Sequence, residues 1–443
     1  MERGRDELRA AGRAVRESFE RDSFGDWRPS EHRDPLAILE RQAATRIPEL
    51  VPLRYGRMLE SPFAFFRGAA AVMACDLAGH PATGIRVQAC GDAHLLNFGV
   101  FATAERRIVF DVNDFDETHP GPWEWDLARL AASVVLAARS RGFTTTDAQA
   151  ATEACVVTYA RTLAQLAKLT TLGVWYADVT ADEVLEGLES RADRKAARRL
   201  VAKARTKDAR RAFEKLTIVR DGRRTIIDDP PWTEHTDDFD IEHVLAFLEG
   251  YRSTLSADRA HLLDQFTPVD AARKVVGVGS VGTRCAIAIG VGTTDDDPLV
   301  LQVKEAEASV LEPHVGRSIY THHGRRVVEG QTIMQAAGDP LLGWSAGPGG
   351  RDYYVRQLWD MKGSIRVERT TPRSLVVYSE LCAAALARAH ARSVNPSLLA
   401  GYCGGGARLA RGFHRFAEAY ADQTERDHAE LTDAARSGLL AVA

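Results

Sequence analysis

The chain has 443 residues, of which 45% are hydrophobic and 27% are charged, and its formal net charge is −4. This composition is typical of a soluble globular enzyme of two or three packed units, and it indicates no nucleic-acid or membrane partner. The longest apolar stretch, residues 130–138, is too short to span a bilayer, and residues 1–16 lack the apolar core of a signal peptide. Six cysteines without C-x-x-C spacing favour buried thiols in a reducing compartment, so we expect a cytoplasmic protein.

The predicted elements divide the chain into five parts. They are an N-terminal helical segment (1–60), a catalytic part of a helical lobe (61–145), a helical insertion with a hairpin (146–265), a β lobe (266–365) and C-terminal helices (366–443). The β-like runs lie at 85–90, 107–112, 274–279, 284–291, 299–303 and 353–358. Helices are predicted at 62–78, from Trp123 onward, and at 314–337, 374–393 and 406–438. The hairpin is expected around Asp221-Gly222, a strong turn pair.

A glycine-rich segment, residues 277–282, fits the pattern G-x-G-x-x-G. In a dinucleotide-binding unit the third glycine opens a helix, but here a strand-like run follows, which argues against an NAD-binding oxidoreductase. Strand, glycine turn, strand is the arrangement of a kinase loop that covers the ATP phosphates, because glycines let backbone N–H groups approach the phosphate oxygens. We therefore expect this loop to bind ATP through Gly277, Gly279, Ser280 and Gly282.

Lys304 ends the β-like run at 299–303. A kinase fold needs a lysine at this point to neutralise the α- and β-phosphates, and a carboxylate of the next helix to hold the lysine. We expect Glu329 to be that carboxylate, with Glu307 and Glu312 as alternatives because Glu329 is distant along the chain. The competing interpretation of Lys304 is an exposed lysine at a strand end.

The segment 90–99 carries Asp92 and Asn97 at the D-x-x-x-x-N spacing of a kinase catalytic loop. In that chemistry the aspartate accepts the proton of the attacking hydroxyl, and the asparagine oxygen binds Mg²⁺. His94 also fits a metal hydrolase with Asp92, but no second histidine stands at ligand spacing nearby. A turn-capping role is the structural alternative for Asp92.

Carboxylates crowd the segment that follows the β-like run at 107–112. Like charges this close repel one another unless a cation is present, and Mg²⁺ prefers one or two carboxylates together with substrate phosphates. Asp114 is the best candidate ligand, with Asp116 assisting and Asp111 as the alternative. An EF-hand is excluded by Phe115 at a ligand position.

Several of these motifs resemble those of aminoglycoside and choline-type phosphotransferases. Residues 91–97 resemble their H-G-D-x-H-x-x-N loop, residues 113–117 and 125–128 resemble their I-D-F-D and D-L-A segments, and residues 386–390 resemble the helix that runs into the loop. Cys90 stands where the loop usually begins with a histidine. Over nearly the whole chain the sequence also resembles a bacterial family catalogued as domain of unknown function 2252, through residues 66–68, 91–99, 121–123, 356–358 and 361–363. This resemblance implies a kinase-like fold and brings no established substrate.

The order of the motifs differs from that of ordinary kinases, because Asp92 and Asp114 precede Gly277 and Lys304. A circular permutation accounts for this order, since domain termini often lie close together. We therefore expect an α+β, protein-kinase-like two-lobed fold that is circularly permuted. A small antiparallel β nucleotide lobe and a larger helical lobe would form it, with Gln357 near a hinge that contacts adenine.

The function predicted from these motifs is ATP- and Mg²⁺-dependent phosphoryl transfer to a hydroxyl group. ATP and a hydroxyl-bearing acceptor are the expected partners, and the sequence identifies neither the acceptor nor the oligomeric state. Transfer of AMP by the same fold is one alternative, and a nucleotide-binding pseudokinase or scaffold is another.

Overall fold

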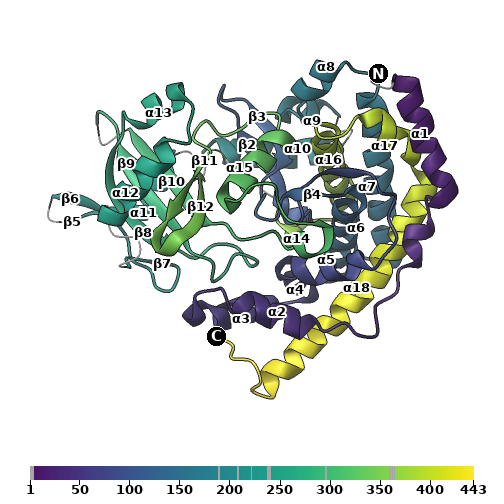
Figure 1. Cartoon of the computed structure of the whole chain (residues 1–443), viewed down its shortest axis with the longest axis horizontal. Coiled ribbons are helices and arrows are strands. Elements are labelled where there is room, and N and C mark those ends of the chain that lie inside the picture. The colour runs from purple at the N-terminus through teal and green to yellow at the C-terminus, as the bar shows by residue number, and fades with distance from the viewer. Residues whose placement is uncertain are drawn as a thin grey trace.

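The protein is described from a computed structural model, which covers residues 4–187, 190–206, 209–220, 222–236, 241–294, 297–358, 361, 363 and 365–443. It is an α+β protein with a six-stranded antiparallel sheet on one side and a large group of helices on the other (Figure 1). Within these ranges, no helix combines the length and the apolar character that a bilayer crossing requires.

The N-terminal part contains the helices α1 (Arg5–Ser18), α2 (Pro35–Ala43), α3 (Val51–Leu59), α4 (Pro62–Gly68) and α5 (Ala70–Ala78). Prolines begin α2 and α4, where the missing N–H costs no helical hydrogen bond. The single helix predicted at 62–78 was wrong, because the chain breaks at Ala69, with φ −113° and ψ 35°. The break is stabilised from outside by Arg54 and Arg129, whose guanidinium groups donate to carbonyl oxygens at the end of α4.

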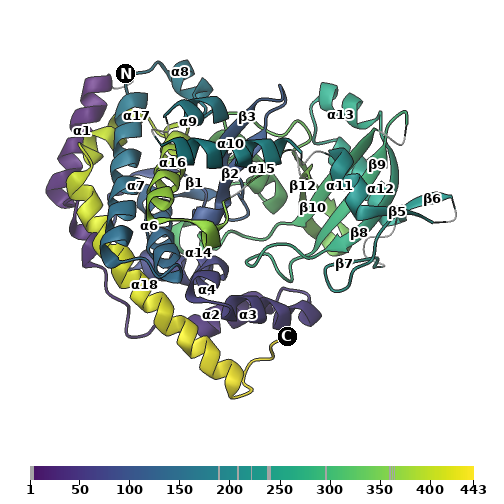
Figure 2. The same ribbon diagram turned by 180° about the vertical axis from the view of Figure 1, so that it is seen from behind.

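Longer helices build the rest of the helical side: α6 (Trp123–Ser140), α7 (Thr145–Leu166), α16 (Pro372–Ala391), α17 (Pro396–Cys403) and α18 (Ala407–Arg436). Helix α6 is buried on nearly every side and packs against α7, α16 and α18, so it forms the centre of the main core. Trp123 at its start stacks on Tyr159 of α7. Figure 2 shows α18 crossing the helical side toward α3. The helices predicted at 374–393 and 406–438 are confirmed as α16 and α18.

Two small antiparallel pairs lie within the helical side. Strand β1 (Arg86–Ala89) pairs with β4 (His119–Pro122), and β2 (Phe98–Ala102) pairs with β3 (Ile108–Val112). Residues 90–97 connect β1 to β2, and residues 113–118 connect β3 to β4. The segment with Asp92 and the segment with Asp114 and Asp116 therefore each begin at the end of a strand. The runs predicted at 85–90 and 107–112 are confirmed as β1 and β3.

The segment after α7 is mostly helical. It contains α8 (Thr171–Tyr176), α9 (Ala181–Gly187), α10 (Arg191–Arg205), α11 (Ala209–Leu216), α12 (Ile241–Arg252) and α13 (Ala257–Leu263). The predicted hairpin is confirmed as β5 (Thr217–Arg220) paired with β6 (Arg223–Ile226). Gly222 has a φ of 74° in its turn, whereas Asp221 lies outside the described residues.

The six-stranded sheet has the order β11-β12-β10-β9-β8-β7, and all its neighbouring strands are antiparallel. Its strands are β7 (Thr233–Glu234), β8 (Thr267–Lys274), β9 (Cys285–Val291), β10 (Pro298–Glu305), β11 (Gly343–Gly347) and β12 (Arg351–Gln357). Because side chains alternate along a strand, Ala286 and Ala288 pack with α12 on one face, and Ile287 and Ile289 pack with α11 on the other.

Two predictions for this side of the molecule were wrong. The strand predicted at 274–279 lies earlier in the chain, as β8, which ends at Lys274. Residues 275–284 form the loop that connects β8 to β9 and contains the glycine-rich segment. Pro268 and Asp270 hide this strand in the sequence because they interrupt its apolar alternation. The helix predicted at 314–337 is divided into α14 (Glu312–Val315) and α15 (His323–Met334), because the chain turns at Gly316 with a φ of 100°.

Candidate functional site

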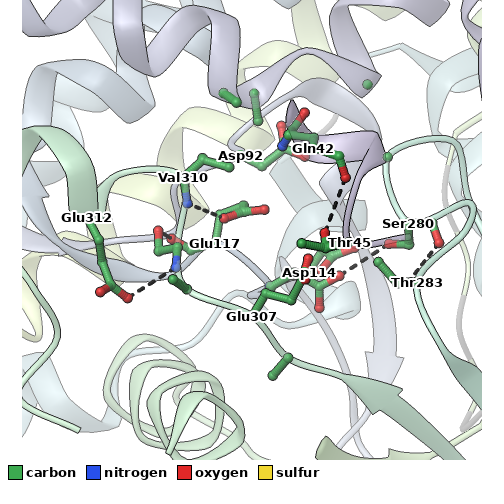
Figure 3. A pocket seen from close by; sticks show the side chains of 18 of the residues that line it. Gln42, Thr45, Asp92, Asp114, Glu117, Ser280, Thr283, Glu307, Val310 and Glu312 are labelled. Carbon is green, nitrogen blue, oxygen red and sulfur yellow. Dashed lines mark hydrogen bonds between the residues drawn. The ribbon is translucent and has the colours of Figure 1, made fainter. Parts of the chain in front are cut away.

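A pocket of about 970 Å³ is lined by residues of both sides of the molecule (Figure 3). The predicted site residues that line it are Asp92, Asn97, Asp114, Asp116, Gly277, Gly279 and Ser280. Lys304 adjoins it through a direct contact with Asp116, and Gly282 closes the glycine-rich loop. The structure therefore brings together most of the residues that the sequence singled out from two distant segments.

The turn that carries Asp92 is built around Gly91. Gly91 has a φ of 79°, and a Cβ there would lie 2.4 Å from the carbonyl oxygen of Glu117, so only glycine fits. Asn97 closes the turn, because its Nδ2 donates to the carbonyl oxygen of Asp92 at 2.7 Å. This bond turns the amide nitrogen inward and leaves the amide oxygen as the atom that Asn97 can offer to a cation.

Asp126 holds the start of the same loop. Its buried carboxylate accepts hydrogen bonds from the backbone N–H groups of Cys90 at 2.7 Å and Gly91 at 2.9 Å. His390 Nε2 lies 3.0 Å from the carboxylate, and His390 Nδ1 lies 2.7 Å from the hydroxyl of Tyr159. A neutral imidazole satisfies both of these contacts. The loop is thus positioned through its backbone, and its start does not depend on the side chain of Cys90.

Asp92 lies in a positively charged environment. Arg129 of α6 is buried and its Nε bonds to Asp92 Oδ1, while His94 Nε2 lies 3.7 Å from Oδ2. Burial acts to raise the pKa of Asp92, but the charge and the hydrogen bond of Arg129, together with the charge of Arg67, outweigh it and hold the pKa below its usual value. Burial in turn lowers the pKa of His94 to about 3, so the imidazole is neutral at physiological pH. Asp92 is therefore an ionised acceptor of hydrogen bonds.

Lys304 and Asp116 form the contact that joins the sheet to the helical side. They are 188 positions apart, yet the Nζ of Lys304 pairs with Asp116 Oδ2, and the hydroxyl of Tyr354 donates to Oδ1 at 2.6 Å. Burial acts to raise the pKa of Asp116, but Lys304 and Tyr354 lower it to about 2. Burial and the charge of Asp116 raise the pKa of Asp114. The carboxylate of Asp116 is thus stably ionised, and a cation beside Asp114 would act against the rise in its pKa.

The expectation that Glu329 holds Lys304 was wrong. Glu329 is half-exposed on α15 and pairs with Arg325 one turn earlier, at 3.4 Å. Glu312 does not take its place, because it accepts the backbone N–H groups of Ser309 and Ser318 and lies 3.9 Å from Arg326. Glu307 lines the pocket, but within the described ranges it forms no ion pair with Lys304. Among the described residues, the carboxylate that contacts Lys304 is Asp116, which the sequence suggested only as an assisting metal ligand.

The expectation for Gln357 also needs correction. Its backbone N–H donates to Asp339 at 2.5 Å, and its side-chain amide donates to the same carboxylate at 3.1 Å. It lines a separate cavity of about 30 Å³, together with Arg356 and Asp339. Gln357 does not line the main pocket. Its backbone N–H and its side-chain amide both bond to Asp339 at the C-terminal end of β12.

The N-terminal segment anchors the glycine-rich loop, which the sequence did not predict. Buried Arg46 donates to the carbonyl oxygen of Val281, Ile47 N–H donates to that of Gly282 at 2.8 Å, and Arg57 donates to that of Gly277. These bonds engage backbone carbonyls on both arms of the loop, whereas the N–H of Val281 donates within the loop to the carbonyl oxygen of Val278 at 3.3 Å. Ser280 Oγ donates to Asp116 Oδ2 at 3.2 Å, so the tip of the loop reaches the carboxylates.

Comparison with known proteins identifies the family. The chain matches a family described as an uncharacterised protein conserved in bacteria, DUF2252, over residues 46–434. The chain belongs to this family. No curated protein and no solved structure matches it. The matched residues of this DUF2252 protein include the loop of Asp92, the glycine-rich loop and the C-terminal helices, whereas α1 lies before them.

The pocket of this DUF2252 protein offers oxygen ligands suited to a hard cation. Asp114, Asp116 and Asn97 line it from two segments of the helical side. In the described part of the chain, no three His, Cys, Asp or Glu side chains form a ready metal cluster. This donor set fits Mg²⁺, which binds through one or two carboxylates and completes its shell with phosphate oxygens and water.

Proposed function

We propose that this DUF2252 protein transfers a phosphoryl group from ATP–Mg²⁺ to a hydroxyl-bearing acceptor, through a circularly permuted kinase-like fold. The contact between Lys304 and Asp116 is the observation that carries the proposal. It joins a strand-end lysine to a carboxylate that follows the Asp92 loop, in one pocket that a glycine-rich loop borders. Phosphoryl transfer needs this combination, because catalysis rests on positioning and on neutralising phosphate charge.

The sheet supports the kinase-like part of the proposal. In chain order it provides a strand, the glycine-rich loop, a second strand, a third strand with Lys304, helix α15 and two further strands. A kinase nucleotide lobe uses the same sequence of parts, with its lysine on the third strand. The proposed permutation accounts for the order of the parts, because the loop of Asp92 precedes this sheet and α16 to α18 follow it. The departure is at α15, which gives Lys304 no carboxylate.

The roles of the residues follow from their positions. Asp92, ionised and held by Arg129, would orient the acceptor hydroxyl and accept its proton. The loop N–H groups and Lys304 would bind the phosphates, and Mg²⁺ held by Asn97, Asp114 and Asp116 would neutralise their charge. With nucleotide and cation present, Asp116 would exchange the ammonium of Lys304 for the cation, which leaves the lysine for the phosphates.

Asp92→Asn tests the proposal. The variant keeps the size of the side chain and loses the proton acceptor, so we expect ATP binding to change little and turnover to fall about 100-fold or more. Binding is measured by calorimetry with Mg²⁺, and turnover against a panel of hydroxyl-bearing metabolites. Asp264→Asn, at an exposed ion pair with Arg252, is the matched control. Unchanged turnover in Asp92→Asn would remove Asp92 from the mechanism.

ATP labelled at the α- or γ-phosphate separates the alternatives in the same assay. Label transferred from the γ position supports phosphoryl transfer, whereas label transferred from the α position identifies AMP transfer. Wild-type protein that binds ATP and transfers neither label is a nucleotide-binding pseudokinase or scaffold. Wild-type protein that binds no nucleotide contradicts the whole proposal.

A further inference from the structure

Arg67 occupies a rigid position at the edge of the pocket. It lies in the last turn of α4, between two residues whose carbonyl oxygens are fixed. Buried Arg129 donates to the carbonyl oxygen of Phe66 at 2.9 Å, and buried Arg54 donates to that of Gly68 at 3.1 Å. Because Arg129 also bonds to Asp92, the backbone at Arg67 and the loop of Asp92 are held by the same side chain.

The guanidinium group of Arg67 lacks the partners that the neighbouring arginines have. Its Nε is buried without a hydrogen bond, as are those of Arg46 and Arg326, but within the described ranges the Arg67 side chain makes no hydrogen bond or ion pair at all. By contrast, Arg46 bonds to the glycine-rich loop and Arg326 bonds to the carbonyl oxygen of Thr118 at 2.7 Å. A half-buried cation with an unused planar set of donors is suited to an anionic ligand, which it can bind through two parallel hydrogen bonds.

Two neighbours define which part of a ligand would reach Arg67. On one side is Asp92, whose ionised form is favoured by the charge of Arg67. On the other is the glycine-rich loop: a Cβ at Gly279 would lie 3.3 Å from the backbone carbonyl oxygen of Arg67, and both residues line the pocket. In the proposed reaction the loop covers the phosphates and Asp92 faces the acceptor. The group that passes between these two positions is the phosphoryl group in transfer.

We propose that Arg67 binds the phosphoryl group while it is transferred, an inference that rests on the proposed function. In that step the acceptor oxygen forms a bond to the γ-phosphorus, and the bond from this phosphorus to the oxygen of ADP breaks. The hydroxyl proton passes to Asp92, and ADP leaves with the electron pair of the broken bond. Arg67 stabilises the negative charge on the equatorial phosphoryl oxygens, a contribution that arginines in other phosphoryl-transfer sites make.

The test uses tetrafluoroaluminate, which together with ADP–Mg²⁺ mimics the phosphoryl group in transfer. In the wild-type protein we expect tetrafluoroaluminate to tighten the binding of ADP–Mg²⁺. In Arg67→Gln we expect ADP–Mg²⁺ alone to bind as in the wild type, and the tightening to fall about 100-fold or more. Arg67→Lys keeps the charge without the planar fork, so we expect it to recover only part of the effect.

Arg325→Gln is the matched control, because Arg325 lies on α15 in a half-exposed pair with Glu329. Thermal unfolding establishes that each variant is folded, and if Arg67→Gln is not, the Arg67→Lys comparison decides. Full tightening in the folded Arg67 variants overturns the inference and assigns Arg67 to an anionic group of the acceptor. A wild-type protein that binds ADP–Mg²⁺ without any tightening also overturns it. Absence of nucleotide binding in the wild type is a different result, which contradicts the proposed function itself.

Discussion

The position of the Asp126 carboxylate leads to a prediction that can be tested without knowledge of the acceptor. Asp126→Asn keeps the shape of the side chain but replaces one carboxylate oxygen with an NH₂ group. The carboxylate now accepts from Cys90 N–H, Gly91 N–H and His390 Nε2. In the better of the two amide orientations, the oxygen stays with Cys90 and His390, and the NH₂ group faces the N–H of Gly91. Two donors then oppose each other in a buried site.

The expected cost follows from that geometry. One hydrogen bond to a charged acceptor is lost, worth about 1.5–3 kcal/mol, and a buried N–H is left without a partner, which costs about 1–3 kcal/mol. The two contributions overlap, so we expect the opening free energy of the loop to fall by about 3 kcal/mol. Since about 1.4 kcal/mol corresponds to a factor of ten, protection of the Gly91 amide against hydrogen exchange should fall roughly 100-fold.

Hydrogen exchange followed by mass spectrometry measures this protection in peptides that cover residues 88–97. Asp422→Asn is the matched control, because Asp422 of α18 pairs with Arg139 of α6 and its side chain is 54% exposed. We expect the control to change protection and stability by less than about 0.5 kcal/mol. If the Cys90 and Gly91 amides exchange as slowly in Asp126→Asn as in the wild type, the conclusion that this carboxylate positions the loop is refuted.

Two further predictions concern pH and the glycine-rich loop. Burial raises the pKa of Glu124 to about 7 from its ordinary value of 4.5, so the folded state favours the protonated carboxyl group. The stability that this protonated group contributes is fully present below pH 4.5 and is lost as the pH rises through 7. Glu124→Gln mimics the protonated group. In urea unfolding we expect the variant to be more stable than the wild type by about 3 kcal/mol at pH 8 and by less than about 1 kcal/mol at pH 5. A difference in the free energy of unfolding that stays the same at both pH values would contradict this prediction. Arg46→Ala removes the anchor of the loop at Val281, so calorimetry should find ATP–Mg²⁺ affinity about tenfold lower, with the exposed Arg415→Ala as control. An unchanged affinity would mean that Arg46 does not position the loop for nucleotide.

The sequence was sufficient for features that depend on neighbouring residues. Short apolar runs predicted β9, β10 and β12, and longer helical segments predicted α16 and α18, because these patterns reflect how one element is buried along its own length. It also predicted the loop of Asp92, where Gly91 must adopt a positive φ and Asn97 must reach back to Asp92 within a single turn. Spacing along the chain controls such contacts directly.

Only the tertiary structure decided which distant residues meet. Lys304 pairs with Asp116 across 188 positions instead of with Glu329, which lies half-exposed on α15 and pairs with Arg325 of the same helix. The bond from Arg46 to the glycine-rich loop was equally inaccessible to sequence reasoning, since it joins segments 235 positions apart. A side chain takes the oppositely charged partner that packing brings within a few ångströms, and that packing is decided by the fold as a whole rather than by local pattern.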